Sequence, residues 1–200
     1  MASMATIQWH SGGLAHGLDR KAVLLDRDNT INLDPGYLNN PDDVALMPGA
    51  VEGLQRLQEA GFLLLVLSNQ SGVGRGKIRP EELLSVNHRI IALLLEHGIR
   101  LERIYFCPHI DGDQCACRKP ASGLVVKALE DFALRAEDCW IIGDRFRDLA
   151  CAVSSNIPGI LVGESEGSIG QLSDPPANLR FHVHNLQQAA DSILGSGSTP

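Results

Sequence analysis

Short and almost entirely apolar runs alternate with helix-like segments along most of this 200-residue chain. A strand that is apolar along its whole length has to be covered on both faces, so these runs predict a parallel sheet with helices on either side. The fold class is therefore α/β, a doubly wound parallel sheet, with functional residues expected at the carboxyl ends of its strands. The expected strands cover residues 22–25, 62–67, 103–106, 140–142, 159–162 and 180–183.

The segments between these strands carry the start and stop signals of helices. Pro48 introduces a helix that runs to about residue 60, with Val51, Leu54 and Leu57 on one apolar stripe. Pro80 begins a second helix, which ends at Gly98. Two more are expected over residues 122–132 and 147–154.

Length and composition restrict the function classes. Two hundred residues suit one domain, expected over residues 21–194 between a flexible leader (1–20) and a flexible tail (195–200). A net charge of −7 and an aromatic content of 4% argue against a nucleic-acid partner. No run approaches the roughly 20 apolar residues that span a bilayer, and the leader lacks the apolar core of a secretory signal. We therefore expect a cytoplasmic monomer without a membrane partner.

Acidic residues follow two of the predicted strands. Asp26 and Asp28 come directly after the first, where one carboxylate can attack phosphorus while the other transfers protons. Asp144 follows the fourth strand and, with Asp26, would provide carboxylates for Mg²⁺, which takes few of them together with phosphate and water. Alternatively, these acids only end strands, and Asp148 only satisfies the amides of the next helix.

The other two strand ends carry groups that can bind phosphate. Ser68 opens the stretch S-N-Q-S-G-V-G-R-G, in which a hydroxyl beside free amides can bind phosphate oxygens and Arg75 can reach a second anionic group. Lys119 follows the third strand and would offset the charge of a phosphoryl group that meets a carboxylate. Alternatively, the glycine-rich stretch is only a flexible connection and Lys119 is only solvated.

Four possible metal ligands lie within about ten residues. Cys107, His109, Cys115 and Cys117 suit tetrahedral zinc, and because the protein would fill all four positions the site would be structural. Zinc here would order the loop that leads into Lys119. The alternative is a coincidence of three thiols and a surface histidine.

The groups at the four strand ends resemble, in their order along the chain, the motifs of the haloacid dehalogenase superfamily of phosphatases over residues 21–165. This order is Asp26 and Asp28, then Ser68, then Lys119, then Asp144 and Asp148. The resemblance implies a Rossmann-like HAD fold in which Asp26 is the nucleophile that forms an aspartyl-phosphate and Asp28 is the general acid and base. It also implies that Ser68 and Lys119 hold the transferring phosphoryl group. Mg²⁺ would be bound by Asp26, the Asp28 carbonyl and Asp144.

Within this superfamily the pattern C-x-H with C-x-C-R-K-P is similar to two branches, the heptose 1,7-bisphosphate phosphatases and the histidinol-phosphate phosphatases. The stretch that begins at Ser68 looks more like the heptose branch, which implies a sugar phosphate substrate in contact with Asn69, Arg75 and Arg118. Asn29 departs from the branches' usual glycine, and residues 121–124 depart from their usual x-P-G-M.

The spacing of the motifs leaves no room for a large cap domain, although residues 32–47 can form a small flap. A different class of function also remains open at this stage. A catalytically idle phosphosugar-binding or zinc-stabilised interaction module would share the same loops, although it has no need for both Asp26 and Asp28.

Overall fold

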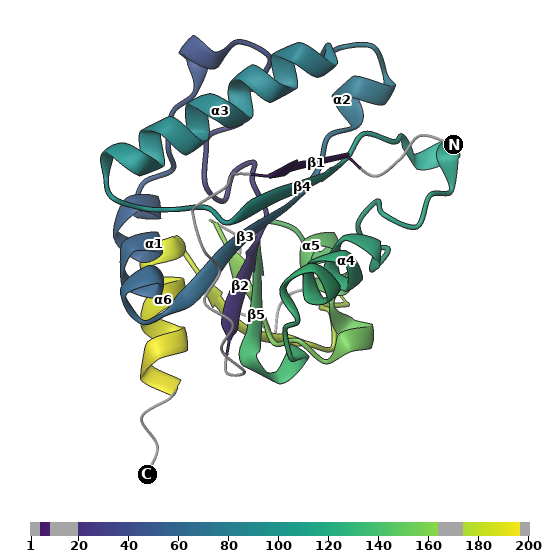
Figure 1. Cartoon of the computed structure of the whole chain (residues 1–200). Coiled ribbons are helices and arrows are strands. Elements are labelled where there is room, and N and C mark those ends of the chain that lie inside the picture. Colours follow the sequence, from purple (N-terminus) through teal and green to yellow (C-terminus); the bar gives the residue numbers. More distant parts are fainter. Residues whose placement is uncertain (1–4, 9–19, 164–173, 197–200) are drawn as a thin grey trace.

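The structure is a computed structural model that describes residues 5–8, 20–163 and 174–196. A seven-stranded sheet in the order β1-β4-β3-β2-β5-β6-β7 runs through the molecule (Figure 1). Only β1 is antiparallel to its neighbour, and all six strands expected from the sequence are present and parallel. The strands are β1 (Ala5–Gln8), β2 (Lys21–Leu25), β3 (Phe62–Asn69), β4 (Arg103–Cys107), β5 (Cys139–Gly143), β6 (Gly159–Val162) and β7 (Leu179–Val183).

Helices cover both faces of the sheet, as expected for a doubly wound fold. Three of them, α1 (Ala50–Glu59), α3 (Pro80–Glu96) and α6 (Leu186–Ser196), lie on one side in Figure 1, while α4 (Gly123–Phe132) and α5 (Phe146–Ala150) lie on the other. The helix predicted over residues 147–154 is shorter, since α5 ends at Ala150 and a 3-10 turn follows. The short elements are α2 (Ser71–Gly74), η1 (Pro41–Asp43), η2 (Asp111–Asp113), η3 (Ala136–Asp138) and η4 (Val153–Ser155).

The central strands bury side chains in two layers. Val23 and Leu25 of β2 pack towards α1, α3 and α6, whereas Ala22 and Leu24 pack towards α4 and α5, and all four are fully buried. Successive side chains of a strand point to opposite faces, so burial on both sides requires an apolar residue at every position. This is why the strands were recognisable as continuous apolar runs.

The amino-terminal leader predicted over residues 1–20 is interrupted by a strand. Ala5–Gln8 pairs antiparallel with β4 and forms the edge of the sheet, with Ala5 opposite Phe106 and Gln8 opposite Arg103. Four residues at an edge do not need the continuous apolar run that a central strand needs, so no apolar pattern marks this strand. The other leader residues, 1–4 and 9–19, lie outside the described residues. At the other end, α6 extends to Ser196 into the predicted tail, of which residues 197–200 are also outside.

The strand order brings the carboxyl ends of the three central strands together, where a ligand site is expected. From β2 the chain proceeds to β3 and β4 on one side and to β5, β6 and β7 on the other, so the order reverses next to β2. Leu25 is in register with Val66 of β3 and with Ile142 of β5, which brings the ends of the three strands together. Ligands bind at such a switch point in open α/β sheets.

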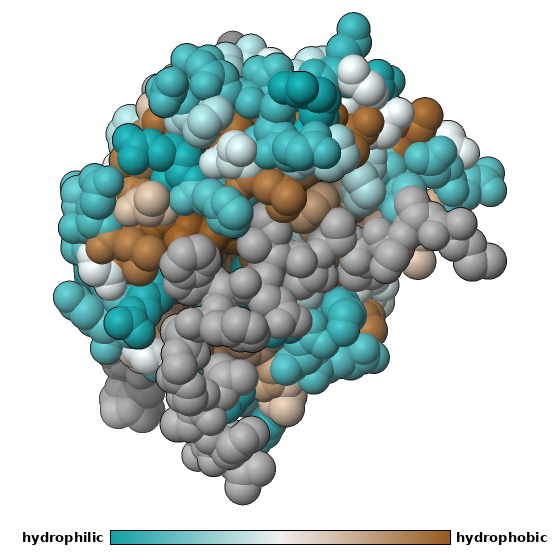
Figure 2. Space-filling model, turned by 45° about the horizontal axis from the view of Figure 1, so that its top comes forward, coloured by the Kyte–Doolittle hydropathy of each residue, from teal (hydrophilic) through white to brown (hydrophobic). Residues whose placement is uncertain are grey.

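No cap domain is inserted between the predicted motifs, because every residue from 20 to 163 is described and this part holds only the elements named above. The segment of residues 32–47 instead contains η1, which packs against α3. Among the described residues, no helix has both the length and the hydropathy that crossing a bilayer requires. Hydrophilic residues predominate on the described part of the face in Figure 2, with hydrophobic groups between them.

Candidate active site

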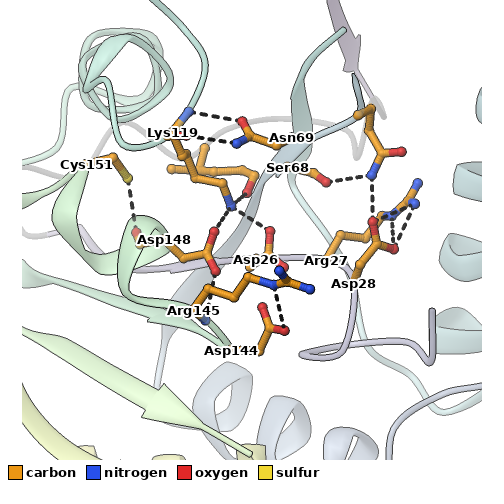
Figure 3. A network of polar contacts seen from close by, with 12 residues as sticks. Asp26, Arg27, Asp28, Ser68, Asn69, Lys119, Asp144, Arg145, Asp148 and Cys151 are labelled. Atoms are coloured by element: carbon orange, nitrogen blue, oxygen red, sulfur yellow. Dashed lines mark hydrogen bonds and ion pairs between the residues drawn. The ribbon is translucent and has the colours of Figure 1, made fainter. Parts of the chain in front are cut away.

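A buried lysine connects the predicted nucleophile to a second carboxylate (Figure 3). Lys119, in the turn before α4, has only 1% of its side chain exposed. Its Nζ atom lies 2.5 Å from Oδ1 of Asp26, 2.8 Å from Oδ1 of Asp148 and 2.6 Å from the carbonyl oxygen of Leu67. The structure thus joins the ends of β2 and β3 to the first turn of α5 through one ammonium group.

The charges at this centre do not balance. Burial by itself lowers the pKa of Lys119, but Asp26 and Asp148 outweigh it and hold this pKa above its usual range. Burial raises the pKa of Asp26; Lys119 opposes the rise, while Asp148 and Asp28 add to it. One ammonium therefore faces several carboxylates in a desolvated environment, which favours the binding of an additional cation.

A third carboxylate completes a cluster suited to such a cation. Carboxylate oxygens of Asp26, Asp144 and Asp148 all lie within 4.8 Å of one another. Burial and then the neighbouring Asp148 raise the pKa of Asp144 to about 6, as expected for like charges held together. A hard divalent cation prefers oxygen ligands of this kind. Asp26 and Asp144 belong to the ligand set predicted from the sequence, whereas Asp148 was not included in it.

A glycine makes room for Asp148. A Cβ atom at Gly143 would lie 2.4 Å from the Cβ of Asp148, closer than atoms can approach. The other Asp148 oxygen accepts a hydrogen bond from the backbone N–H of Arg145 at 3.0 Å. Asp148 therefore both caps α5 and pairs with Lys119, so the capping role considered from the sequence accounts for only one of its two oxygens.

The side chain of Asp28 belongs to a separate network. Its carboxylate accepts hydrogen bonds from Nε and Nη2 of Arg27 at 2.9 and 3.0 Å, from Gln70 at 2.7 Å and from Asn32 at 3.2 Å. Figure 3 shows Asp28 directed towards Arg27, whereas Asp26 is directed towards Lys119. The predicted acid/base and the predicted nucleophile are therefore held by different partners. The metal contact predicted for the Asp28 carbonyl stays a prediction.

Ser68 and Asn69, at the end of β3, have different partners in the site. The hydroxyl of Ser68, which is 1% exposed, accepts a hydrogen bond from Gln70 at 2.8 Å. The amide of Asn69 donates to the Lys119 carbonyl and accepts from the Lys119 N–H, both at 3.0 Å. Asn69 therefore fixes the backbone of Lys119, and its expected contact with substrate stays a prediction.

The structure accounts for Asn29, the residue that departs from the usual glycine. Its backbone φ is 58°, in the left-handed region that asparagine tolerates better than most residues. Its side-chain oxygen accepts a hydrogen bond from the N–H of Asp34 at 3.1 Å. Asn29 thus preserves the turn after Asp28 and also ties that turn to the flap segment of residues 32–47.

The four acidic residues of the site, Asp26, Asp28, Asp144 and Asp148, line a cavity of about 270 Å³. Asn69 also lines it, together with Tyr37 and Leu38 of the flap segment. Two basic residues that the sequence had not indicated, Arg145 and Arg147, also line it.

The two arginines predicted to contact substrate both lie beside an exposed acid, and their contact with substrate stays a prediction. Arg118 donates from Nε to Asp111 Oδ1 at 2.7 Å, and Nη2 of Arg75 lies 3.4 Å from the other oxygen. Arg118 and Asp111 line a second cavity, of about 250 Å³, together with Lys119. The structure therefore brings the two arginines together, as a basic pair whose partner is Asp111.

The four predicted zinc ligands form a compact group. The sulfur atoms of Cys107 and Cys117 are 3.2 Å apart, and that of Cys115 lies 3.6 Å from each of them. The Nδ1 atom of His109 lies 3.4 Å from Cys107 and 3.3 Å from Cys117. Ligand sulfurs on tetrahedral zinc are separated by about 3.8 Å, and disulfide sulfurs by about 2.05 Å. The geometry therefore fits four ligands around one zinc ion and does not fit a disulfide.

Comparisons with known proteins agree with this arrangement. A family model described as polynucleotide kinase 3 phosphatase matches residues 21–146, and one described as HAD-hydrolase-like matches residues 116–189. The D-glycero-beta-D-manno-heptose-1,7-bisphosphate 7-phosphatase of Haemophilus influenzae is 31% identical over 182 residues, which cover 84% of this chain and 99% of that protein. That of Yersinia pestis is 35% identical over 143 residues, covering 68% and 76%.

The chain belongs to the heptose-bisphosphatase family of HAD-like phosphatases. A solved structure supports the assignment: the D,D-heptose 1,7-bisphosphate phosphatase from B. bronchiseptica, complexed with magnesium and phosphate, has a TM-score of 0.80 at 28% identity. The match covers 88% of this chain and 99% of that one.

Several residues around the centre of this HAD-like phosphatase were not recognised from the sequence. They are Arg27, Asn32, Gln70 and Asn87, which surround Asp28 directly or through one another. A signal existed for Asn87, because it is a polar residue on the apolar stripe of α3 formed by Leu83, Ile90 and Leu94.

Proposed function

We propose that this HAD-like phosphatase removes the C7 phosphate of D-glycero-D-manno-heptose 1,7-bisphosphate in the formation of nucleotide-activated heptose. The chemistry rests on one observation above all, the Asp26 carboxylate held 2.5 Å from a buried ammonium beside two further carboxylates. The substrate rests on the two relatives, which are named for this activity and match over most of their length.

The reaction proceeds in two displacements. An oxygen of Asp26 attacks phosphorus, the bond from phosphorus to the C7 oxygen breaks, and Asp28 gives its proton to the leaving alkoxide. Asp28 then takes a proton from water, which attacks the phosphorus. The bond to Asp26 breaks, which releases inorganic phosphate and regenerates the carboxylate. The Lys119 ammonium and the Ser68 hydroxyl hold the phosphoryl oxygens during both steps.

We also propose a metal ion at each of the two ligand groups. Mg²⁺ held by Asp26, Asp144 and the Asp28 carbonyl, with Asp148 as a further carboxylate, would neutralise charge on the phosphoryl group. Zn²⁺ held by Cys107, His109, Cys115 and Cys117 would fix the loop that leads into Arg118 and Lys119. The donor sets support this division, because the first is all oxygen and the second is sulfur with one imidazole.

The arginine pair gives the phosphate that is not hydrolysed a place to bind. Arg75 and Arg118 share Asp111, whose side chain is 73% exposed and whose pKa is held below its usual range by Arg118. A phosphate can replace a carboxylate between two guanidinium groups because both are bidentate acceptors. The C1 phosphate of the substrate would therefore displace Asp111 from this pair.

A substrate panel with Mg²⁺ tests the proposal. We expect kcat/KM for heptose 1,7-bisphosphate to exceed that for histidinol phosphate by roughly 100-fold or more, since the second phosphate has its own partners. A preference for histidinol phosphate would overturn the proposed identity of the substrate and leave the proposed mechanism unchanged.

Acid quenching during turnover tests the mechanism itself. The wild-type protein is expected to carry phosphate on Asp26, and Asp26→Asn to carry none. If both proteins were equally inactive on a broad panel and still bound a phosphosugar, the chain would be a binding module. The expectations of a monomer and of a cytoplasmic location stay predictions, of which gel filtration tests the first.

A further inference from the structure

A buried cation separates the two acids of the active site. The side chain of Arg27 is 1% exposed although it lies between Asp26 and Asp28 in the sequence. Its Nε and Nη2 atoms donate to the two oxygens of Asp28 at 2.9 and 3.0 Å, and Nη1 donates to the side-chain oxygen of Asn87 at 2.8 Å. Burying a guanidinium is unfavourable unless its donors are satisfied, so this fork fixes the geometry of its partners.

The Arg27 guanidinium makes its third hydrogen bond with Asn87, which comes from α3. Asn87 is fully buried on the helix face that carries Val86 and Ile90 into the core. Its amide nitrogen has no hydrogen-bond partner, so its oxygen, bound to Arg27, is its only satisfied polar group. An apolar residue would be the cheaper choice at such a position, which indicates that Asn87 is there for Arg27.

The remaining donors complete the hold on Asp28. Gln70 donates to one Asp28 oxygen and Asn32 to the other, so each oxygen accepts from the guanidinium and from one side-chain amide. Gln70 also donates to Ser68, which links this network to the phosphate-binding side. As Figure 3 shows, the Asp28 carboxylate contacts neither Asp26 nor Lys119.

We propose that Arg27, anchored by Asn87, is a positioning residue that sets the orientation from which Asp28 exchanges protons with the leaving group and with water. The four hydrogen bonds occupy all the acceptor sites of the carboxylate, so Asp28 takes up its proton at an oxygen that Asn32 or Gln70 releases, while Arg27 keeps the carboxylate in place. The inference rests on the proposed function, because it takes Asp28 as the acid and base. Arg27 acts only through Asp28, so its loss should impair the steps that need a proton and leave the others intact. A lysine, with a single nitrogen, cannot make the same pair of hydrogen bonds to both oxygens of Asp28.

Leaving groups of different basicity separate these steps. An alkoxide needs a proton from Asp28 to depart, whereas p-nitrophenolate departs without one. For Arg27→Lys we expect kcat/KM for the heptose bisphosphate to fall roughly 30-fold or more, and kcat/KM for p-nitrophenyl phosphate to fall no more than about threefold. Because water activation is also impaired, p-nitrophenol should appear in a burst of up to one equivalent before steady state.

Three further variants make the result decisive. Asn87→Asp keeps the shape of Asn87, but its carboxylate competes with Asp28 for the guanidinium of Arg27. It should show the same pattern more weakly, and it keeps the test available if Arg27→Lys does not fold. Tyr105→Phe removes a buried hydroxyl that bonds Asp131 away from the site, and should lower the melting temperature without changing the ratio of the two substrates. Asp28→Asn should show the largest ratio.

The outcomes distinguish the two levels of inference. Equal losses on both substrates in Arg27→Lys and Asn87→Asp, with a changed ratio in Asp28→Asn, would overturn the positioning role alone. An unchanged ratio in Asp28→Asn would overturn the assignment of Asp28 as acid and base, and with it the proposed mechanism.

Discussion

Two groups of ion pairs include the neighbouring residues Arg118 and Lys119, and they differ in exposure. At the proposed phosphoryl-transfer centre, Lys119, Asp26 and Asp148 have 1%, 10% and 4% of their side chains exposed. At the arginine pair, Arg75 and Asp111 are 43% and 73% exposed, whereas Arg118 is 12% exposed. Charges attract strongly where water is excluded and weakly where it is present. The first group is therefore fixed for chemistry, whereas the second can exchange its carboxylate for a phosphate.

The largest effect should come from breaking the buried group. Lys119→Met removes the ammonium from two desolvated carboxylates, so we expect kcat to fall roughly 10³-fold. The free energy of unfolding should fall by about 3 kcal/mol, because carboxylates are left buried without their partner. Steady-state kinetics and denaturant unfolding measure the two effects.

Arg118→Met provides the matched comparison at the arginine pair, whose shared carboxylate is exposed. It should leave kcat within about threefold and act mainly on KM for the bisphosphate, because in our proposal the arginine pair binds only the remote phosphate. The contrast between the two groups would be lost if both variants changed kcat alike.

A smaller effect should follow from displacing Asp148 without changing any charge. Gly143→Ala places a methyl group 2.4 Å from the Cβ of Asp148, so the carboxylate has to move away from Lys119. We expect kcat to fall roughly 10- to 100-fold and the free energy of unfolding to fall by about 1–3 kcal/mol. Gly112→Ala, where an added Cβ meets nothing within 4 Å, is the control and should behave as wild type. Wild-type kcat in Gly143→Ala would show that Asp148 is not required where it lies.

The difference between the two groups also explains what the sequence could predict. Asp26 and Ser68 lie at the ends of strands that are almost entirely apolar, and Lys119 lies in the loop after β4, so their meeting at one sheet edge followed from chain order. The pairing of Arg75 and Arg118 with Asp111 depends on the fold of a loop and left no periodic pattern. The helix α6 did have an available signal in the spacing of Leu186, Ala189, Ala190 and Ile193.

The network around Asp28 was not predictable in the same way. Gln70 and Asn87 meet Asp28 and Arg27 across 42 and 60 residues of sequence, through tertiary packing of β3 and α3 against β2. The positions of Asp26 and Asp28 themselves were predictable, because both residues follow the end of β2. Their side-chain partners come from elements whose relative rotation no local pattern specifies.

Removing zinc should affect the exposed group more than the buried one. Cys117→Ser, or a strong chelator, is expected to abolish zinc binding and to lower the melting temperature, because the loop loses the cross-link that the proposed zinc ion would provide. KM for the bisphosphate should rise about tenfold as Arg118 loses its orientation, with a smaller loss in kcat. Metal analysis and kinetics check this, and Cys151→Ser, outside the ligand group, is the control. Full zinc content in Cys117→Ser would remove Cys117 from the ligand set.

The smallest effect should come from Asp111→Asn, and its sign is informative. The substitution removes the carboxylate that competes with phosphate for Arg75 and Arg118, so KM for the bisphosphate should fall roughly two- to fivefold with kcat unchanged. KM for a sugar monophosphate should not change, because that substrate has no second phosphate to bind there. The effect should shrink as salt is added, since the pair is exposed and screened. A rise in KM would mean that Asp111 holds the arginines ready for substrate, and that this exposed group is as fixed in function as the buried one.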